Sequence, residues 1–463
     1  MFFSYEYDKI VSIIFLRSKK MKNTFGKRNM SALILFGLIG QIAWSVENMY
    51  FNLFVFDTIE PNLSAITLMV QLSAIAATAV TLIAGTLSDK LGNRRLFISI
   101  GYIVWGVTVG IFGFISPSLF ESLFGIEGAA AIKAALTAVI IGDCVMTLFG
   151  STANDAAFNA WVTEVTPQSL RGRIESILSI LPLLSLLIVA GGFGILVGAV
   201  GYAPVFLSLG AVISLSGILG IFIIRDSETI EKSGALRDIV FGFKVSTVKS
   251  FKPFYVTLLI MCVYGIACQI FMPYMIIYMK EYLGFGVLEY SVIFGLAIAF
   301  GAIINLFLGK LADTLPKEKM LYTAAAVFAA GLLLMYLMKD MGKWATLILF
   351  GISGFIMITG YIFISSLTGA ILREQTPQNE AGKLQGVRMI FSVLIPMLVG
   401  PTLGNGINKL RNIPLPNADT SADAMTTLYI PAPEIYLAAA AVTLILFAII
   451  PLLIKVLKNK SKE

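Results

Sequence analysis

The residues from Gly85 to Arg95, GTLSDKLGNRR, form a short polar stretch between two long apolar runs. Asp89 stands four residues after the first glycine, and Gly92 and a basic pair that begins at Arg94 follow it. A helix that crosses a bilayer needs roughly 20 mainly apolar residues, and the runs on both sides are long enough. We therefore interpret this stretch as a tight hairpin between two membrane-spanning helices.

The composition extends this interpretation to the whole chain. Of 463 residues, 57% are hydrophobic and only 13% are charged, and the mean hydropathy is +0.88. A soluble domain carries about a quarter charged residues, so the sequence predicts an all-α integral membrane protein. Twelve apolar runs are long enough to span, at approximately 31–56, 64–88, 96–117, 136–160, 174–199, 203–224, 254–279, 287–312, 320–338, 344–371, 384–408 and 434–457.

Two polar loops each have a partner about half a chain away. The hairpin is repeated in weaker form by GKLADTLPKEK at 309–319, where Asp313 takes the place of Asp89. The loop TEVTPQSLRGRIESI at 163–177 matches REQTPQNEAGKLQGV at 373–387, with a constant shift of 210 residues (373 − 163). Each loop and its partner fall at equivalent places in successive sets of six spans. The sequence therefore predicts a duplicated unit of six helices.

This duplication sets the expected domain organisation. We predict a cytoplasmic extension at 1–30, bundles of six helices at 31–224 and 254–457, a charged cytoplasmic linker at 225–253 and a cytoplasmic tail at 458–463. The proline-rich segment 409–433 is expected to be an irregular outer loop of unknown role. Translation can begin at Met1 or at Met21, and the sequence does not decide between them.

The net charge of +7 reflects membrane topology rather than a nucleic-acid partner. If both termini are cytoplasmic, most of the 34 Lys and Arg residues lie on the cytoplasmic side, as the positive-inside rule requires. The basic residues expected on the outer side are Lys133, Lys280, Lys339, Lys343, Lys409 and Arg411. We therefore expect a monomeric, multi-pass protein of the plasma membrane that does not bind nucleic acid.

Six residues of the hairpin, Gly85, Leu87, Asp89, Gly92, Arg94 and Arg95, resemble the loop between helices two and three of the major facilitator superfamily. The resemblance implies two pseudo-symmetric six-helix bundles, related by an axis along the membrane normal, that work by alternating access. In that family the hairpin aspartate faces the start of helix eleven, where a carboxylate is stabilised by the helix dipole. The residues this implies for gating are Gly85, Asp89, Gly92, Arg94, Arg95, Arg171, Arg173, Asp313, Lys383 and Arg388.

Span one is the most polar span and carries an acid, Glu47, beside a stripe of polar and aromatic side chains. Polar groups facing lipid are costly, so this stripe is expected to face protein or a water-filled cavity. Glu47 is either a substrate or proton site, or a hydrogen-bonded acid that locks two helices together. Span four adds Asp143 and Asp155, which have the same two interpretations. The candidates for proton coupling are Glu47, Asp143 and Asp155.

Amides and aromatic side chains inside the spans suit a polar solute, because amides bond hydroxyl groups and rings stack on apolar faces. The predicted substrate-binding residues are Gln41, Trp44, Asn48, Asn52, Asn154, Tyr264, Gln269, Asn305 and Tyr361. The leading hypothesis is a secondary transporter that moves a sugar or glycoside in symport with a proton or sodium ion. The alternatives are a proton-driven exporter of drugs or metabolites, and a receptor or scaffold that does not transport.

Departures from family patterns bear on the subtype. The glycine segment of span five, AGGFG at 190–194, lacks the proline of the antiporter signature, whereas span eleven has GPTLG at 400–404. The GNRR loop and the RGR after span four are similar to those of sugar transporters, including glycoside–cation symporters. Span two, however, has no aspartate to reproduce their sodium site, and span four has no arginine of the kind found in many proton-coupled members.

Several chemistries are excluded by what the sequence lacks. It has no histidine, which rules out histidine-based catalysis, metal ligation and proton relays. Its three cysteines, Cys144, Cys262 and Cys268, fall inside predicted spans, so neither a disulfide framework nor a thiolate metal site is implied. No GxxxxGK[ST] motif for binding nucleotide phosphates is present. We therefore expect no enzymatic activity, no metal site and no cofactor, and transport that is secondary.

Overall fold

The computed structural model describes residues 26–167, 170–226, 241–312, 315–338, 342–376, 381–416 and 428–460. Within these ranges twelve helical segments are long and apolar enough to cross a membrane, which confirms the predicted number of spans. They run over Lys27–Ile59, Leu63–Ala84, Arg94–Phe112, Ala129–Val165, Ile180–Val200, Tyr202–Ile223, Lys252–Tyr282, Val287–Asn305, Lys317–Tyr336, Lys343–Gln375, Gly386–Arg411 and Glu434–Asn459. They are numbered one to twelve below.

Several spans combine ordinary α-helix with short, wider or tighter turns. The first half comprises α2 (Lys27–Val46), η1 (Glu47–Phe51), α3 (Asn52–Phe54), η2 (Val55–Ile59), α4 (Leu63–Leu91), α5 (Arg94–Phe112), α6 (Pro117–Phe124), α7 (Ala129–Gly150), η3 (Ser151–Phe158), α8 (Asn159–Val165), α9 (Arg171–Ile188), η5 (Val189–Phe193), α10 (Gly194–Val200) and α11 (Tyr202–Ile223). The second comprises η6 (Phe241–Phe243), α13 (Val245–Ser250), α14 (Lys252–Phe271), η7 (Met272–Tyr274), α15 (Met275–Ile277), η8 (Tyr278–Tyr282), α16 (Val287–Ala312), α17 (Lys317–Tyr336), α18 (Lys343–Gln375), α19 (Ala381–Met389), η10 (Ile390–Leu394), α20 (Ile395–Arg411), β1 (Ile413–Pro414), β2 (Tyr429–Ile430), α21 (Glu434–Leu444) and α22 (Leu446–Lys460).

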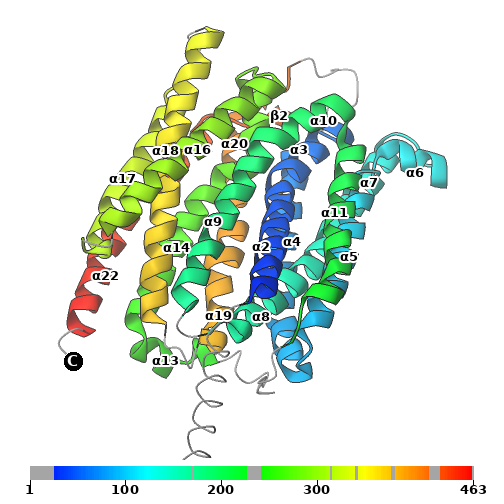
Figure 1. Cartoon of the computed structure of the whole chain (residues 1–463). Coiled ribbons are helices and arrows are strands. Elements are labelled where there is room, and N and C mark those ends of the chain that lie inside the picture. Colours follow the sequence, from blue (N-terminus) through cyan, green and yellow to red (C-terminus); the bar gives the residue numbers. More distant parts are fainter. Residues whose placement is uncertain are drawn as a thin grey trace, which may run out of the picture.

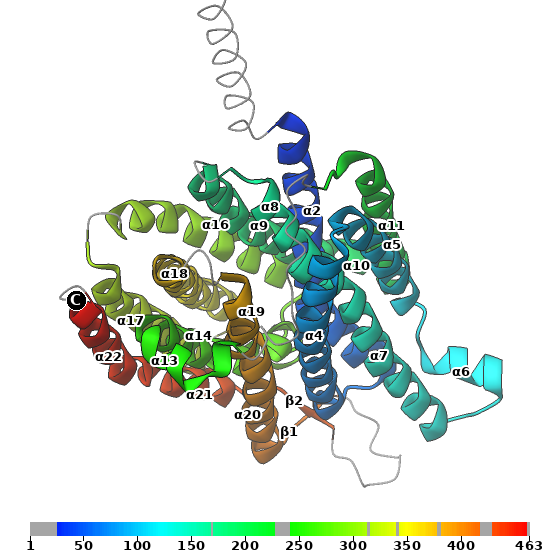
Figure 2. The ribbon, with the colours of Figure 1, turned by 90° about the horizontal axis from the view of Figure 1, so that it is seen from below.

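The two sets of six spans form two bundles side by side (Figure 1). Within the first bundle α5 packs on α11 and α2 on α9, and within the second α17 packs on α18 and α14 on α20. The bundles meet where α4 contacts α20 and where α16 contacts α9, as the view along the helices shows (Figure 2). We call the side that carries α13 and the start of α2 the linker face, and the opposite side the distal face. Both described chain ends lie on the linker face (Figure 1).

The hairpin forms as the sequence predicts, on the linker face. Gly92 ends α4 with φ +66°, and its N–H donates to the Ser88 carbonyl at 2.9 Å. Glycine adopts this left-handed conformation without the steric cost that a side chain carries. The Asn93 side chain then accepts from the Leu96 N–H at 3.1 Å and so caps the start of α5. Two residues are thus enough to reverse the chain between spans two and three.

Small residues set the closest helix approach in the first bundle. A Cβ added to Gly106 of α5 would lie 2.3 Å from the Gly210 carbonyl oxygen of α11, and the reverse addition gives the same distance. In lipid, helices gain little from burying apolar side chains against each other, so close backbone packing between small residues stabilises their contact. These two glycines let α5 and α11 meet along their backbones.

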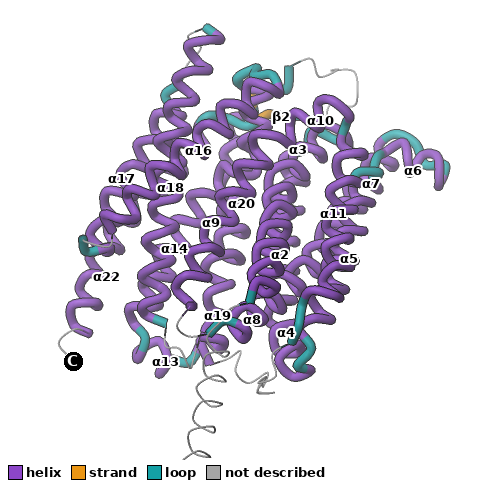
Figure 3. Tube along the Cα trace, in the orientation of Figure 1, coloured by secondary structure: helices purple, strands orange, loops and turns teal. Residues whose placement is uncertain are grey.

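Two segments differ from the sequence expectation. The segment 409–433 is not wholly irregular, because β1 and β2 pair antiparallel, with Ile413 opposite Ile430 and Pro414 opposite Tyr429. This ribbon is the strand structure of the described residues (Figure 3). A short helix, α6, follows span three on the distal face, where no element was predicted; Pro117 at its first turn and the Ser116 side chain, which accepts from the Leu119 N–H, explain its start. Residues 1–25 of the predicted extension 1–30 lie outside the described residues, and α2 already begins at Lys27.

Candidate functional site

A cavity of about 400 Å³ lies between the two bundles, at the level of the polar stripe of span one. Its walls come from spans one, two, four, five, seven, ten and eleven, so both halves of the chain contribute. Seven residues proposed from the sequence for binding or coupling line it: Gln41, Trp44, Glu47, Asn48, Asp155, Gln269 and Tyr361. The structure therefore brings together residues that lie more than 300 positions apart in the sequence (361 − 41 = 320).

Four proposed binding residues do not line the cavity, and each has a polar group bonded to another part of the protein. The Asn52 amide donates to the Asn48 carbonyl at 2.9 Å. Asn154 accepts from the Tyr102 hydroxyl at 3.2 Å, and the Tyr264 hydroxyl donates to the Tyr361 carbonyl at 3.1 Å. Asn305 donates to the carbonyls of two neighbouring helix residues, Gly301 and Thr359. Their proposed roles in binding stay predictions, and none of the four lines the cavity.

Local widening of the helices positions the acids. Span one changes to a wider, π-type turn at η1, which begins at Glu47, and span four does so at η3, which contains Asp155. Such turns insert an extra residue per turn and are frequent at functional sites. At both places the spans depart from the 100° per residue that sequence reasoning assumes, and Glu47 and Asp155 line the cavity.

Glu47 is the acid at the distal end of the cavity. Its side chain is 8% exposed, and Oε1 accepts from the hydroxyls of Ser73 and Thr147, each at 3.1 Å. These two hydroxyls, from spans two and four, are themselves 2.7 Å apart. Asp143 of span four is only 2% exposed and does not line the cavity. Glu47 of span one is therefore held by hydroxyl groups from two other spans.

Asp155 forms a separate acidic position nearer the linker face. Its Oδ2 accepts from the Ser151 hydroxyl, one helical turn earlier, at 3.0 Å. The side chain lines the cavity and is half-buried. It can therefore contact a solute directly, whereas Asp143 is buried and does not line the cavity.

Sequence reasoning missed much of the lining. Four methionines contribute thioether groups to the cavity wall: Met49, Met272, Met389 and Met397. Pro182 and Ser392 also line it. No pattern in the sequence distinguishes these methionines from the lipid-facing and core apolar residues around them. The two hydroxyls that hold Glu47 were likewise not singled out as functional, because serine and threonine occur throughout the spans.

Hydrogen bonds and an ion pair close the distal side of the cavity. The Tyr274 hydroxyl of span seven meets the Thr67 hydroxyl of span two at 2.7 Å and donates to the Pro401 carbonyl of span eleven at 3.0 Å. The Gln71 amide of span two donates to the Leu398 carbonyl at 2.9 Å. Lys280 pairs with Asp57 across the two halves at 2.6 Å. In this conformation the halves are joined at their distal ends.

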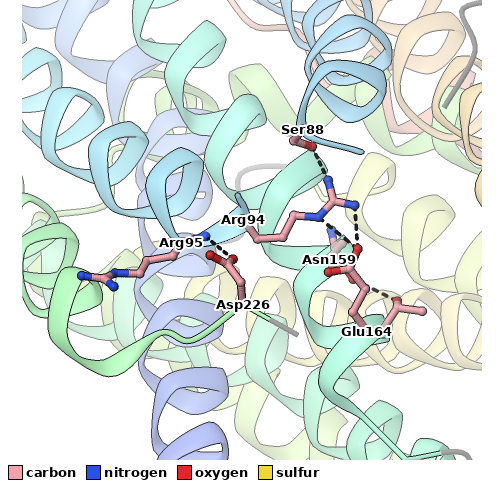
Figure 4. Close-up of polar contacts among 7 residues, drawn as sticks. Ser88, Arg94, Arg95, Asn159, Glu164 and Asp226 are labelled. Atoms are coloured by element: carbon pink, nitrogen blue, oxygen red, sulfur yellow. Dashed lines mark hydrogen bonds and ion pairs between the residues drawn. The ribbon is translucent and has the colours of Figure 1, made fainter. Parts of the chain in front are cut away.

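On the linker face, the hairpin arginines are anchored within the first half (Figure 4). Arg94 is 3% exposed; its Nε and Nη2 donate to Glu164 Oε1 at 3.1 and 2.6 Å, and its Nη1 donates to the Ser88 hydroxyl. The Arg95 N–H donates to Asp226 at 2.9 Å. The ends of spans two, three, four and six are thereby tied together.

The expected latch between Asp89 and the start of span eleven stays a prediction. Asp313 and the side chains of Asp89, Arg171, Arg173 and Lys383 lie outside the described part of the structure, and Gly85 is part of helix α4. Arg388 is exposed on α19. The α19 backbone does contact a side chain of α4 there, because a Cβ on Gly386 would lie 2.6 Å from Leu82 Cδ2.

Among the described residues, no group of three or more His, Cys, Asp or Glu side chains could hold a metal ion. The three cysteines are free.

Comparisons with known proteins agree with this architecture. A family model described as Major Facilitator Superfamily matches residues 30–401, and no curated protein matches the sequence. The solved nucleoside transporter NupG has 12% sequence identity and a TM-score of 0.62, over 93% of this chain and 100% of its own. A D-xylose–proton symporter has 12% identity and a TM-score of 0.64, over 91% and 97%. A bacterial homologue of the iron transporter ferroportin, in an outward-facing state, has 16% and 0.59, over 94% and 99%. At such identities the likeness extends to the fold alone.

Proposed function

The chain belongs to the Major Facilitator Superfamily, and from this membership we propose that it is a secondary transporter that carries a sugar or glycoside in symport with a proton. The observation that carries the proposal is the cavity between the halves, where Gln41, Asn48 and Gln269 offer amide groups within reach of one acid, Glu47. Amides can both donate to and accept from sugar hydroxyls. Trp44 and Tyr361 supply ring faces for the apolar side of a sugar.

Alternating access follows from the placement of the contacts between the halves. The bonds of Tyr274, Gln71 and Lys280 close the distal side, and each is a separate contact of modest strength. A protein can pass between two conformations that differ by a few kcal/mol, so a set of breakable contacts suits a gate. We propose that solute and proton bound together favour the rearrangement that opens one face and closes the other.

The topology of the chain is part of this proposal. We place the linker face in the cytoplasm, because the segments that the sequence assigns to that side, the hairpin and the linker among them, carry most of the 34 Lys and Arg residues. The protein would then be a monomer of the plasma membrane with both termini cytoplasmic, and its partners would be a small solute, a coupling ion and the lipid bilayer. Sodium is the alternative coupling ion in this proposal. We also propose that the protein has no enzymatic activity.

A second candidate is a proton-driven exporter of amphipathic drugs or metabolites. The four methionines in the cavity wall favour it, since flexible thioether side chains adapt to apolar ligands of varied shape. The two candidates share one fold and differ in the chemistry of the solute that the cavity would bind.

Transport by the purified chain in proteoliposomes separates these candidates. An inward-directed proton gradient is imposed, and the entry of radiolabelled D-xylose or uridine and the movement of the dye ethidium are followed. Accumulation of sugar above its outside concentration, lost in Glu47→Gln, supports symport. Extrusion of ethidium without sugar uptake supports the exporter.

If neither Glu47→Gln nor Asp89→Asn changes the uptake that the unmodified chain shows, the proposed mechanism is wrong. A chain that moves none of the probes under any gradient would favour a receptor or scaffold.

A further inference from the structure

The connection between spans three and four is longer than its counterpart in the second half. Residues 113–128 join span three to span four, whereas residues 337–342 are enough to join span nine to span ten. The extra length of the first connection contains α6 (Pro117–Phe124), which the duplication of the chain does not explain. This helix therefore calls for a reason of its own.

α6 has one apolar face and one polar face. The apolar face consists of Leu119, Phe120, Leu123 and Phe124, and the polar face of Ser118, Glu121 and Ser122. At 3.6 residues per turn, the four apolar residues share an arc of about 140° around the helix. An apolar stripe of this width is typical of a helix that turns one face to an apolar environment and the other to water.

The protein covers only part of this apolar face. Phe120 packs partly against the hydrophobic core, and its ring stacks on that of Phe124 with centroids 5.8 Å apart. Leu123 is nevertheless 65% exposed and Phe124 is 67% exposed. Large apolar side chains that are exposed side by side are unfavourable in water and mark a surface that contacts a membrane or another protein. The exposed half of the face therefore needs an occupant.

The place of α6 in the fold indicates that occupant. The helix projects sideways from the distal ends of α5 and α7, away from the second bundle (Figure 1 and Figure 2). Ile111 and Phe114, at the distal end of span three, are exposed as well. On a helix that crosses a bilayer, such side chains are covered by lipid. The apolar face of α6 therefore adjoins a surface that the bilayer already covers.

We propose that α6 is an interfacial anchor, which lies in the plane of the bilayer surface with Leu123 and Phe124 among the lipid chains. Amphipathic helices of this kind bury their apolar face by roughly 5–10 Å at the boundary between headgroups and chains. Glu121 on the polar face then contacts headgroups and water. Because spans three and four hold both ends of the connection, α6 is already at the boundary. It fixes the depth of the distal ends of these two spans.

The charge of the connection shows which part of the lipid α6 recognises. Residues 113–128 contain two acids, Glu121 and Glu127, and no lysine or arginine. Helices that bind anionic lipids carry basic residues on their polar face, so α6 is held by its apolar area and not by headgroup charge. We expect the same insertion in vesicles of phosphatidylcholine with and without phosphatidylglycerol. A second copy of this chain is the competing occupant of the apolar face.

Fluorescent labels on the two faces of α6 test the anchor in the full chain, reconstituted in phosphatidylcholine vesicles. In a background without cysteine, Leu123→Cys and Glu121→Cys each carry an environment-sensitive dye. The two positions lie about 160° apart around the helix, so the second is the matched control. We expect the dye at position 123 to emit at a shorter wavelength and to be quenched by lipids with a nitroxide near the headgroup. Iodide, present on both sides of the membrane, should quench only the dye at position 121.

A change in the apolar face provides a second measurement. With the dye at position 123, Phe124→Ser should reduce quenching by the nitroxide lipids and shift the emission to longer wavelength, whereas Glu121→Gln, on the polar face, should change neither.

Four results overturn the anchor. Iodide that reaches both dyes equally places α6 in water, and nitroxide lipids that quench both dyes equally place the whole helix among the chains. Insertion that requires phosphatidylglycerol shows that headgroup charge holds the helix. A dye at position 123 that neither quencher reaches is covered by protein, and a change in its emission on dilution with unlabelled chains then identifies a second copy. Each outcome is independent of the transported solute, because the anchor requires only the membrane-spanning fold.

Discussion

The buried guanidinium of Arg94 lies 2.6 Å from the Glu164 carboxylate, so the hairpin after span two is bound to the end of span four. The second half contains a similar pair: Lys317, in the weaker hairpin at 309–319, lies 2.8 Å from Glu374, and Glu374 is the partner of Glu164 in the repeated loops. The duplication visible in the sequence therefore recurs as a duplicated ion pair. The two copies differ in burial, because Glu164 is 22% exposed and Glu374 is 53% exposed.

The first prediction compares these two pairs. Glu164→Ala removes the partner of a buried cation, and we expect it to lower the stability by about 3–5 kcal/mol, the usual cost of breaking a buried pair. Lys317→Ala, the matched control in the exposed copy, should cost no more than about 1 kcal/mol. Unfolding of the detergent-solubilised protein, followed by circular dichroism, measures both. Similar losses in the two variants would show that burial does not separate the copies.

The second prediction concerns the distal gate. Tyr274→Phe removes the hydroxyl that joins spans two, seven and eleven, and each hydrogen bond lost is worth about 1 kcal/mol. We expect the population with an open distal face to rise roughly fivefold or more. Spin labels at Thr58 and Leu288, in a background without cysteine, report the distance between the two distal ends. Tyr436→Phe is the control, because its buried hydroxyl has no hydrogen-bond partner among the described residues; an equal shift in both variants would contradict the gate.

The third prediction separates cavity residues from residues that only resembled them in the sequence. Gln269 lines the cavity, whereas Asn305 bonds two backbone carbonyls outside it. We expect Gln269→Ala to weaken binding of the transported solute about tenfold, the effect of one good hydrogen bond. Asn305→Ala should leave affinity unchanged and lower the thermal stability. Equilibrium binding measures the solute affinity of both variants, and thermal unfolding of the same preparations measures their stability. If Asn305→Ala weakens binding and Gln269→Ala does not, the solute binds near Asn305 and not in this cavity.

The fourth prediction tests the close crossing of α5 and α11. Gly210→Ala would place a Cβ 2.3 Å from the Gly106 carbonyl oxygen, so the two helices must separate. We expect a loss of about 1–3 kcal/mol, the usual cost of overpacking. Gly354→Ala in α18 is the control: no atom lies within 4 Å of the added Cβ, and alanine is the better helix former. Thermal unfolding should rank Gly354→Ala at or above the unmodified protein, and a stable Gly210→Ala would refute the packing argument.

The sequence by itself determined the spans, the duplication and the hairpin. Long apolar runs have one stable arrangement in a bilayer, because every backbone N–H and C=O must be bonded within the segment. Gly92 and Asn93 specify their turn through local geometry, so no distant contact is needed to predict it. The polar stripe of span one likewise identified Gln41, Trp44, Glu47 and Asn48 as residues facing a cavity, because water or protein has to cover them.

Tertiary structure alone decided which other side chains meet there. Asn154 and Asn305 have the same side-chain chemistry as Asn48, but their amides bond to Tyr102 and Thr359 of neighbouring helices, and neither lines the cavity. The Asn52 amide bonds to the Asn48 carbonyl within span one, and Asn52 does not line the cavity either. The four cavity methionines gave no signal, since an apolar residue is acceptable in lipid, in the core or in a cavity wall. The hydrogen bonds from Ser73 and Thr147 to Glu47 join three spans. The relative rotation of these spans depends on wide turns that no local pattern predicts. Contacts between helices depend on rotations and depths set by the whole bundle, whereas spans and turns depend on the chain nearby.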